Sequence, residues 1–132
     1  MRILLDTQPW LWTQASSERF NADSLDLVEQ PDTELVLSAA SSWEIAIKYA
    51  LGKLPLHASP GDYVPQRIRS SGGVALPVTH THALRVAMLP PHHRDLFDRL
   101  LVAQAQVENL TILTSNRVCR TTCRSAGRPE AV

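Results

Sequence analysis

The sequence predicts an α/β fold with a parallel sheet. Four short apolar runs, at 2–5, 34–38, 74–78 and 110–114, alternate with longer segments of helical periodicity. The runs lack polar alternation, which is typical of strands buried on both faces of a parallel sheet. Alternation of strands and helices indicates crossover connections, and 132 residues suffice for one domain with one core.

The first half of the chain carries two helix signals after its first strand. Thr7 is expected to cap the first helix, in which Pro9 suits the opening turn and residues 10–12 continue the pattern. Asn21 or Asp23 is expected to cap the second helix, because short polar side chains accept hydrogen bonds from unpaired helical N–H groups.

The middle of the chain predicts three more helices and an edge strand. The segment 41–52 has an apolar face and a closing glycine, and a further helix is expected over 62–69. Pro77 predicts an edge or terminal position, because proline donates no ladder hydrogen bond. Thr81 is expected to cap the helix that ends near Leu89.

The helix before the last strand carries two acids at its start. Its apolar spacing places Leu96, Leu100 and Leu101 on the buried side. Asp95 is a good N-cap, whereas Asp98 stands where a capping box usually has Glu or Gln. Capping therefore explains Asp95 better than Asp98.

Composition excludes several classes of protein. The formal net charge is zero, so nothing in the total demands a nucleic-acid partner, and a local basic patch remains compatible with it. The two cysteines, Cys119 and Cys123, form no disulfide framework and have no zinc-finger spacing. Because no signal peptide or membrane span is expected, the predicted location is the cytoplasm.

Oxygen-bearing side chains fall at the carboxyl ends of the predicted strands. Asp6 and Asn116 directly follow strands, Glu44 begins the helix after the second strand, and Asp95 and Asp98 begin the helix that leads to the last one. In an open parallel sheet these positions share one rim. Clustered carboxylates repel one another unless a cation compensates them, and oxygen ligands suit Mg²⁺ or Mn²⁺. Such an ion supports hydrolysis of a phosphodiester.

Four motifs carry a resemblance to a known family. They occur in order along residues 1–116, as ILLDTQ, LSAASSWEIAIKYALGKL, HRDLFDRLLVAQA and LTILTSN. The chain resembles PIN-domain proteins, specifically VapC-type toxins of type II toxin–antitoxin systems. The resemblance implies a three-layer α/β/α sandwich with a central parallel sheet of four to five strands. It also implies an endoribonuclease that depends on Mg²⁺, with Mn²⁺ as a substitute.

The resemblance also implies site residues and partners. Asp6, Glu44 and Asp98 correspond to the catalytic, metal-binding acids, Asp95 is an accessory position, and Asn116 stands where many relatives have a fourth acid. The implied partners are an RNA substrate, a second copy in a homodimer, and a cognate antitoxin whose segment occupies the groove near the acids.

Other positions give weaker expectations. His92, His93 and Arg94 are expected to contact RNA phosphate or to form a solvated loop. Residues 117–132 have no apolar periodicity, so the PIN-like domain is expected over 1–116 with a flexible tail after it. The tryptophans are expected in the core or at a dimer interface.

Two other functions compete with the nuclease. Without a fourth acid, the chain could be a catalytically weakened or inactive module that binds an antitoxin without cutting RNA. A response-regulator phosphoacceptor domain is disfavoured, because the third strand leads into Thr79 and His80 rather than an Asp.

Overall fold

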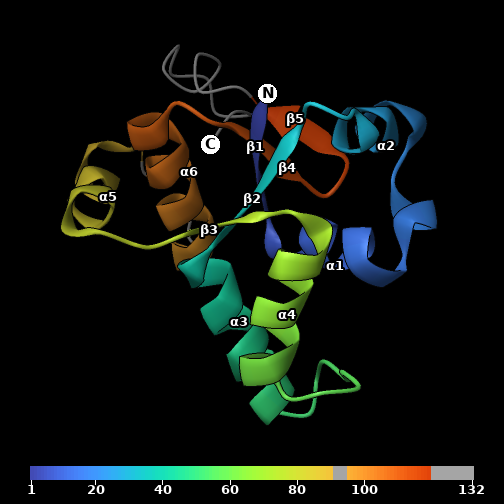
Figure 1. Ribbon diagram of the computed structural model, residues 1–132. Helices are drawn as coiled ribbons and strands as arrows, with labels where there is room; N and C mark the ends of the chain where they lie inside the picture. Colours follow the sequence, from blue (N-terminus) through green and yellow to red (C-terminus); the bar gives the residue numbers. More distant parts are fainter. Residues whose placement is uncertain (91–94, 120–132) are drawn as a thin grey trace.

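The computed structural model describes residues 1–90 and 95–119 and contains one five-stranded sheet of order β3-β2-β1-β4-β5 (Figure 1). The strands are β1 (Arg2–Leu5), β2 (Glu34–Ser38), β3 (Val74–Leu76), β4 (Thr111–Thr114) and β5 (Arg117–Cys119). The first four run parallel, and β5 pairs antiparallel with β4. The predicted positions of the four parallel strands are confirmed, as is the place of β3 at an edge beside Pro77.

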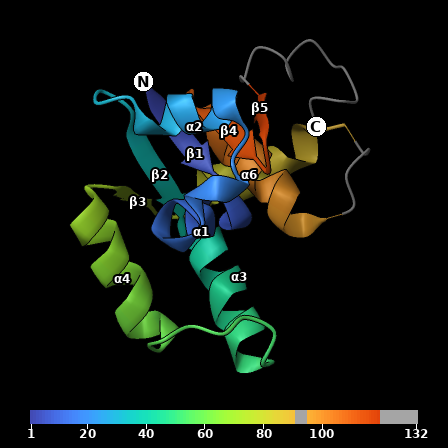
Figure 2. The same cartoon turned by 90° about the vertical axis from the view of Figure 1, so that its right-hand side faces the viewer.

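Six helices surround this sheet in the described residues. They are α1 (Thr7–Ala15), α2 (Ala22–Glu29), α3 (Ala39–Ala50), α4 (Pro60–Ser71), α5 (His80–Arg85) and α6 (Leu96–Glu108). The two views place α5 and α6 on one side of the sheet and α1 and α2 on the other, whereas α3 and α4 extend beyond its end (Figures 1 and 2). Within the described part of the chain, no helix is both long and apolar enough to span a membrane.

Side chains of the central strand divide the core into two halves. Leu4 packs in the cluster that contains Leu101 and Ala105 of α6. Ile3 and Leu5, which point to the opposite face, pack in the cluster that contains Trp10 of α1 and residues of α3 and α4. Because successive strand residues point to opposite faces, a strand that is apolar throughout needs cover on both sides. The predicted α/β/α sandwich is confirmed.

The last strand corrects the expectation for the end of the chain. Residues 117–119, expected in a flexible tail, form β5 and extend the sheet by one antiparallel strand. Ser115, which has φ 49°, allows the tight reversal that pairs Thr114 with Arg117. Main-chain hydrogen bonds to β4 hold this strand in the sheet, although its sequence has no apolar periodicity. The rest of the expected tail, 120–132, lies outside the described residues.

Two helix caps lie elsewhere than expected. Asp6, not Thr7, caps α1, because its carboxylate accepts a hydrogen bond from the Thr7 N–H at 2.8 Å. Thr79, not Thr81, caps α5, and the exchange is reciprocal. The Thr79 hydroxyl accepts from the His82 N–H, and the His82 ring accepts from the Thr79 N–H.

The start of α6 also differs from the expected pattern. Asp95 is its N-cap, as predicted, and accepts from the N–H groups of Phe97 and Asp98. Leu101 is buried as expected, but Leu96 is 77% exposed and Leu100 only half-buried. The buried face of α6 therefore begins later in the helix than the apolar spacing predicts.

Candidate functional site

Asp6 is the most enclosed acid of the predicted cluster. It follows β1 directly, and its carboxylate accepts the Thr7 N–H. The pKa of Asp6 is raised to about 6, mainly by burial and also by the negative charges of Asp98, Glu44 and Asp95, while the hydrogen bond from the Thr7 N–H lowers it in part. The charges of the four predicted acids therefore interact with one another, although the acids come from three separate parts of the chain.

Glu44 reaches this rim from the first half of α3 and is held through both carboxylate oxygens. Oε1 accepts a hydrogen bond of 2.5 Å from the Thr7 hydroxyl, and Oε2 lies 3.0 Å from Lys48 Nζ, one helical turn further along. The surface ion pair with Lys48 stabilises the helix by only ~0.3–0.5 kcal/mol. The bond from Thr7, which is buried, is the stronger restraint on Glu44.

Asp98 enters from the first turn of α6. Burial raises its pKa, with further contributions from the charges of Asp95 and Glu44. Asp95 itself is exposed and its Oδ1 is occupied by the cap of α6. Asp98 is thus a member of the cluster. Asp95 is a capping residue whose negative charge acts on Asp98.

The chemistry of these donors fits a divalent cation. Asp6, Glu44 and Asp98 are carboxylates, and the pKa of Asp6 is raised first by burial and then by the negative charges of the other acids, both of which a bound cation would offset. Among residues 1–90 and 95–119, no three His, Cys, Asp or Glu side chains are already gathered around one metal position. Mg²⁺ usually takes one or two carboxylates and keeps several waters, so the set fits it after side-chain adjustment.

Asn116 is bound to the main chain of another segment. Its Oδ1 accepts from the Asn21 N–H at 2.7 Å, and its Nδ2 donates to the Arg19 carbonyl at 3.1 Å. Asn21 Nδ2 in turn donates to the Asn116 carbonyl. Both polar atoms of the Asn116 amide therefore join the end of β4 to the segment that leads into α2, a contact that the sequence did not predict.

The remaining residues predicted from the sequence have different outcomes. His92, His93 and Arg94 lie outside the described residues. Trp10 is in the core, at 3% exposure, whereas Trp43 is 62% exposed and lies 5.4 Å from the ring of Phe97, between ring centres. Sequence reasoning missed Thr7 as a site residue, although a hydroxyl directly after a strand-end Asp was a usable signal.

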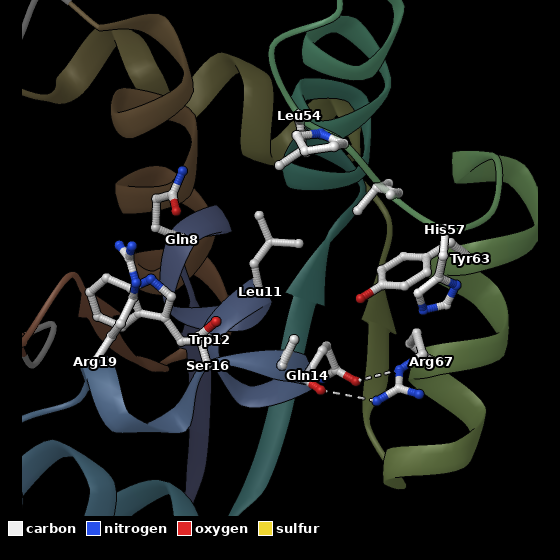
Figure 3. Close-up of a pocket in the computed structure, with 13 residues that line it drawn as sticks. Gln8, Leu11, Trp12, Gln14, Ser16, Arg19, Leu54, His57, Tyr63 and Arg67 are labelled. Atoms are coloured by element: carbon white, nitrogen blue, oxygen red, sulfur yellow. Dashed lines mark hydrogen bonds between the residues drawn. The ribbon is translucent and has the colours of Figure 1, made fainter.

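A pocket of about 390 Å³ is lined by residues of α1, the loop after α3, and α4, and none of the predicted acids lines it. Gln8, two residues after Asp6, lines one end of it, and Arg67 of α4 lines another part (Figure 3). Arg67 donates to Gln14 of α1 through Nε at 2.9 Å and to the Gln14 carbonyl through Nη2 at 3.2 Å. Figure 3 shows the pocket between α1, the loop that follows α3, and α4.

Comparison with known proteins gives a relative that is a ribonuclease by name. Ribonuclease VapC16 of Mycobacterium tuberculosis is 44% identical over 68 residues, which are 48% of this chain and 48% of that protein. The chain thus matches about half the length of that relative.

Two solved structures share the fold. VapBC2 of Rickettsia felis, bound to a promoter DNA fragment, has a TM-score of 0.59 at 14% identity and 85% coverage of both chains. A toxin–antitoxin complex of Klebsiella pneumoniae has a TM-score of 0.54 at 17% identity, with 98% of this chain and 95% of that chain covered. The family model of the PIN domain matches residues 3–124, so this chain belongs to the PIN-domain family.

Proposed function

We propose that the protein is the ribonuclease toxin of a toxin–antitoxin pair and hydrolyses RNA phosphodiester bonds with Mg²⁺ or Mn²⁺. The observation that carries the proposal is the convergence of Asp6, Glu44 and Asp98 on one rim, where their charges act on one another. The similarity to a ribonuclease over 68 residues supports the same activity.

The three acids would hold the cation. When bound, a divalent ion lowers the pKa of a water molecule and stabilises charge on a phosphoryl oxygen. Asp6 after β1, Glu44 in α3 and Asp98 in the first turn of α6 would hold this ion, and the ion would supply the positive charge that the phosphate needs at a rim of carboxylates.

RNA cleavage by purified protein tests this function. Asp98→Asn should reduce cleavage at least 100-fold, because the change removes one charge from the cation site and preserves size. Asp26→Asn, an exposed acid on α2, is the matched control and should cleave like the wild type. Undiminished cleavage by Asp98→Asn contradicts the assignment.

A growth assay separates the nuclease from the inactive module. Expression of the chain without antitoxin should arrest a bacterial culture, and Asp98→Asn should not. A wild-type chain that binds antitoxin but neither arrests growth nor cleaves RNA would instead be the inactive module.

The cognate antitoxin is proposed to occupy the pocket that begins at Gln8. Two fold relatives were solved as toxin–antitoxin assemblies, which supports a protein partner. The pocket combines apolar side chains such as Leu11 with Arg67, so it suits a segment with alternating apolar and acidic residues. Such a segment would lie next to Asp6 and block access of RNA to the acids.

A side chain that fills the pocket should weaken antitoxin binding. Leu11→Arg places a long charged side chain in the pocket and should weaken antitoxin binding at least tenfold by calorimetry. Leu84→Arg, at a 72% exposed leucine on α5, is the control and should bind normally. Equal affinities of both variants contradict this location.

A homodimer is proposed through the exposed apolar stripe of α3. Trp43, Ile47 and Leu51 are spaced four residues apart and are 62%, 37% and 63% exposed. Four-residue spacing places them on one face of α3 and its C-cap Leu51, and an exposed apolar face of this kind marks an association surface, even though Trp43 also contacts the ring of Phe97. Ile47→Glu should convert a dimer to a monomer in light scattering, whereas Leu84→Glu should not.

A further inference from the structure

One residue contacts two of the proposed metal-binding acids. The main-chain N–H of Thr7 donates to Asp6 Oδ1 at 2.8 Å, and its hydroxyl donates to Glu44 Oε1 at 2.5 Å. Thr7 is only 3% exposed, and it joins Asp6, which follows β1, to Glu44 of α3, which lies 37 residues after Thr7 in the chain. We propose that Thr7 is a positioning residue that holds the Glu44 carboxylate beside Asp6 so that both can share one cation. This inference rests on the proposed metal-dependent function.

The direction of the hydrogen bond follows from chemistry. An ionised carboxylate only accepts hydrogen bonds, so the Thr7 hydroxyl must be the donor. Bonds of this kind to an ionised group are shorter and stronger than neutral ones. The buried hydroxyl is itself held by the first turn of α1, whose N-terminus begins at the end of β1. Glu44, with its long flexible side chain, thus takes its position from a rigid part of the fold.

The other partner of Glu44 cannot serve the same purpose. Lys48 lies one turn further along α3, which leads away from the sheet (Figure 1), and its side chain is 40% exposed. If Thr7 gave up its hydrogen bond, Lys48 would remain as the partner and draw the carboxylate along α3 towards solvent. Lys48 also brings a positive charge that opposes a cation. The Thr7 hydroxyl is the partner that orders Glu44 while leaving its negative charge available.

Residues that hydrogen-bond to metal ligands and orient them have a measurable effect on metal affinity. Loss of such a partner typically lowers metal affinity or activity by about 10- to 100-fold. A residue that serves only the packing of α1 would instead lower stability and leave metal affinity unchanged. Metal affinity measured without RNA therefore separates positioning from packing.

Substitutions at Thr7 allow a sharp test. Thr7→Val keeps the shape of the side chain and removes the donor, Thr7→Ala removes the donor without risk of overpacking, and Thr7→Ser keeps the hydroxyl. Mn²⁺ binding to the full chain, free of antitoxin and RNA, is measured by electron paramagnetic resonance. We expect Thr7→Val and Thr7→Ala to need about 10- to 100-fold more Mn²⁺ for half-saturation, and Thr7→Ser to bind within about threefold of wild type.

A second readout follows cleavage as a function of metal concentration. In Thr7→Val the rate at low Mn²⁺ should fall with the lost affinity, while the rate at saturating Mn²⁺ should recover most of the wild-type value. Lys48→Met is the control at the other carboxylate oxygen, and it should bind Mn²⁺ as well as or better than wild type. Circular dichroism and thermal unfolding establish that each variant is folded.

The outcomes distinguish this proposal from the function on which it rests. Wild-type Mn²⁺ affinity in folded Thr7→Val or Thr7→Ala overturns the role of Thr7 and leaves the nuclease standing. A loss in Lys48→Met equal to that in Thr7→Val overturns it as well, since any restraint on Glu44 would then serve. Wild-type protein that neither binds Mn²⁺ nor cleaves RNA overturns the proposed function, and this inference with it.

Discussion

Asn116 Oδ1 accepts a hydrogen bond of 2.7 Å from the main-chain N–H of Asn21, 95 residues earlier in the chain. The same amide donates to the Arg19 carbonyl, so one side chain joins the end of β4 to the segment before α2. This clamp, rather than a metal contact, accounts for both polar atoms of Asn116 in the structure.

Loss of the clamp should affect stability more than metal binding. Asn116→Ala leaves the Asn21 N–H and the Arg19 carbonyl without their partner, which should cost about 1 kcal/mol because water can replace part of the loss. Urea unfolding measures the change, and Mn²⁺ affinity should stay at the wild-type value. A tenfold weaker Mn²⁺ affinity would instead make Asn116 a metal ligand.

Asp6 should make the metal-free protein less stable at neutral pH than at acidic pH. Its pKa is about 6 in the folded protein and 3.8 in the unfolded chain, so the folded state binds the proton more tightly. The stabilisation from this proton is complete below about pH 4 and is lost as the pH rises through about 6, a difference of about 3 kcal/mol.

The variant Asp6→Asn tests this dependence. Asparagine keeps the N-cap of α1 and cannot ionise, so the variant should be more stable than wild type above pH 6 in the presence of EDTA. Urea unfolding between pH 4 and 7.5 gives the comparison. Parallel stability curves for the two proteins would refute it. Added Mg²⁺ should stabilise the wild type more than the variant.

His82 should act as a structural residue between α5 and α6. It is 1% exposed, and because Nδ1 accepts the Thr79 N–H, the proton resides on Nε2 and is donated to Glu108 at 2.7 Å. His82→Leu removes the acceptor for the Thr79 N–H and should destabilise the fold by about 2–4 kcal/mol. Glu108→Gln keeps an acceptor and should cost about 1 kcal/mol or less.

The two leucines of α6 should respond very differently. Leu101 is 2% exposed, so Leu101→Ala should cost about 2–5 kcal/mol through lost burial and a cavity. Leu96, at 77% exposure, should tolerate Leu96→Ser within about 0.5 kcal/mol. Thermal or urea unfolding decides between them. A large loss at Leu96 would mean that another surface covers the start of α6 in solution.

Much of the fold follows from local pattern. Strands that are apolar throughout, such as 34–38, predict a sheet covered on both faces, and the helix caps at Asn21 and Asp95 follow from side-chain chemistry within a few residues. The convergence of Asp6, Glu44 and Asp98 follows from topology, because carboxyl ends of parallel strands share one rim.

Other features depended on contacts between distant residues. The hydroxyl of Thr7 and the amide of Asn116 find their partners 37 and 95 residues away, and short-range spacing carries no information about such pairs. The strand β5 formed because β4 presented an unpaired edge, although its own residues lack strand periodicity. The sequence by itself determined which residue types reach the rim of the sheet. Only the tertiary structure decided which of them is held by a buried donor, since hydrogen bonds across the core depend on how the layers pack.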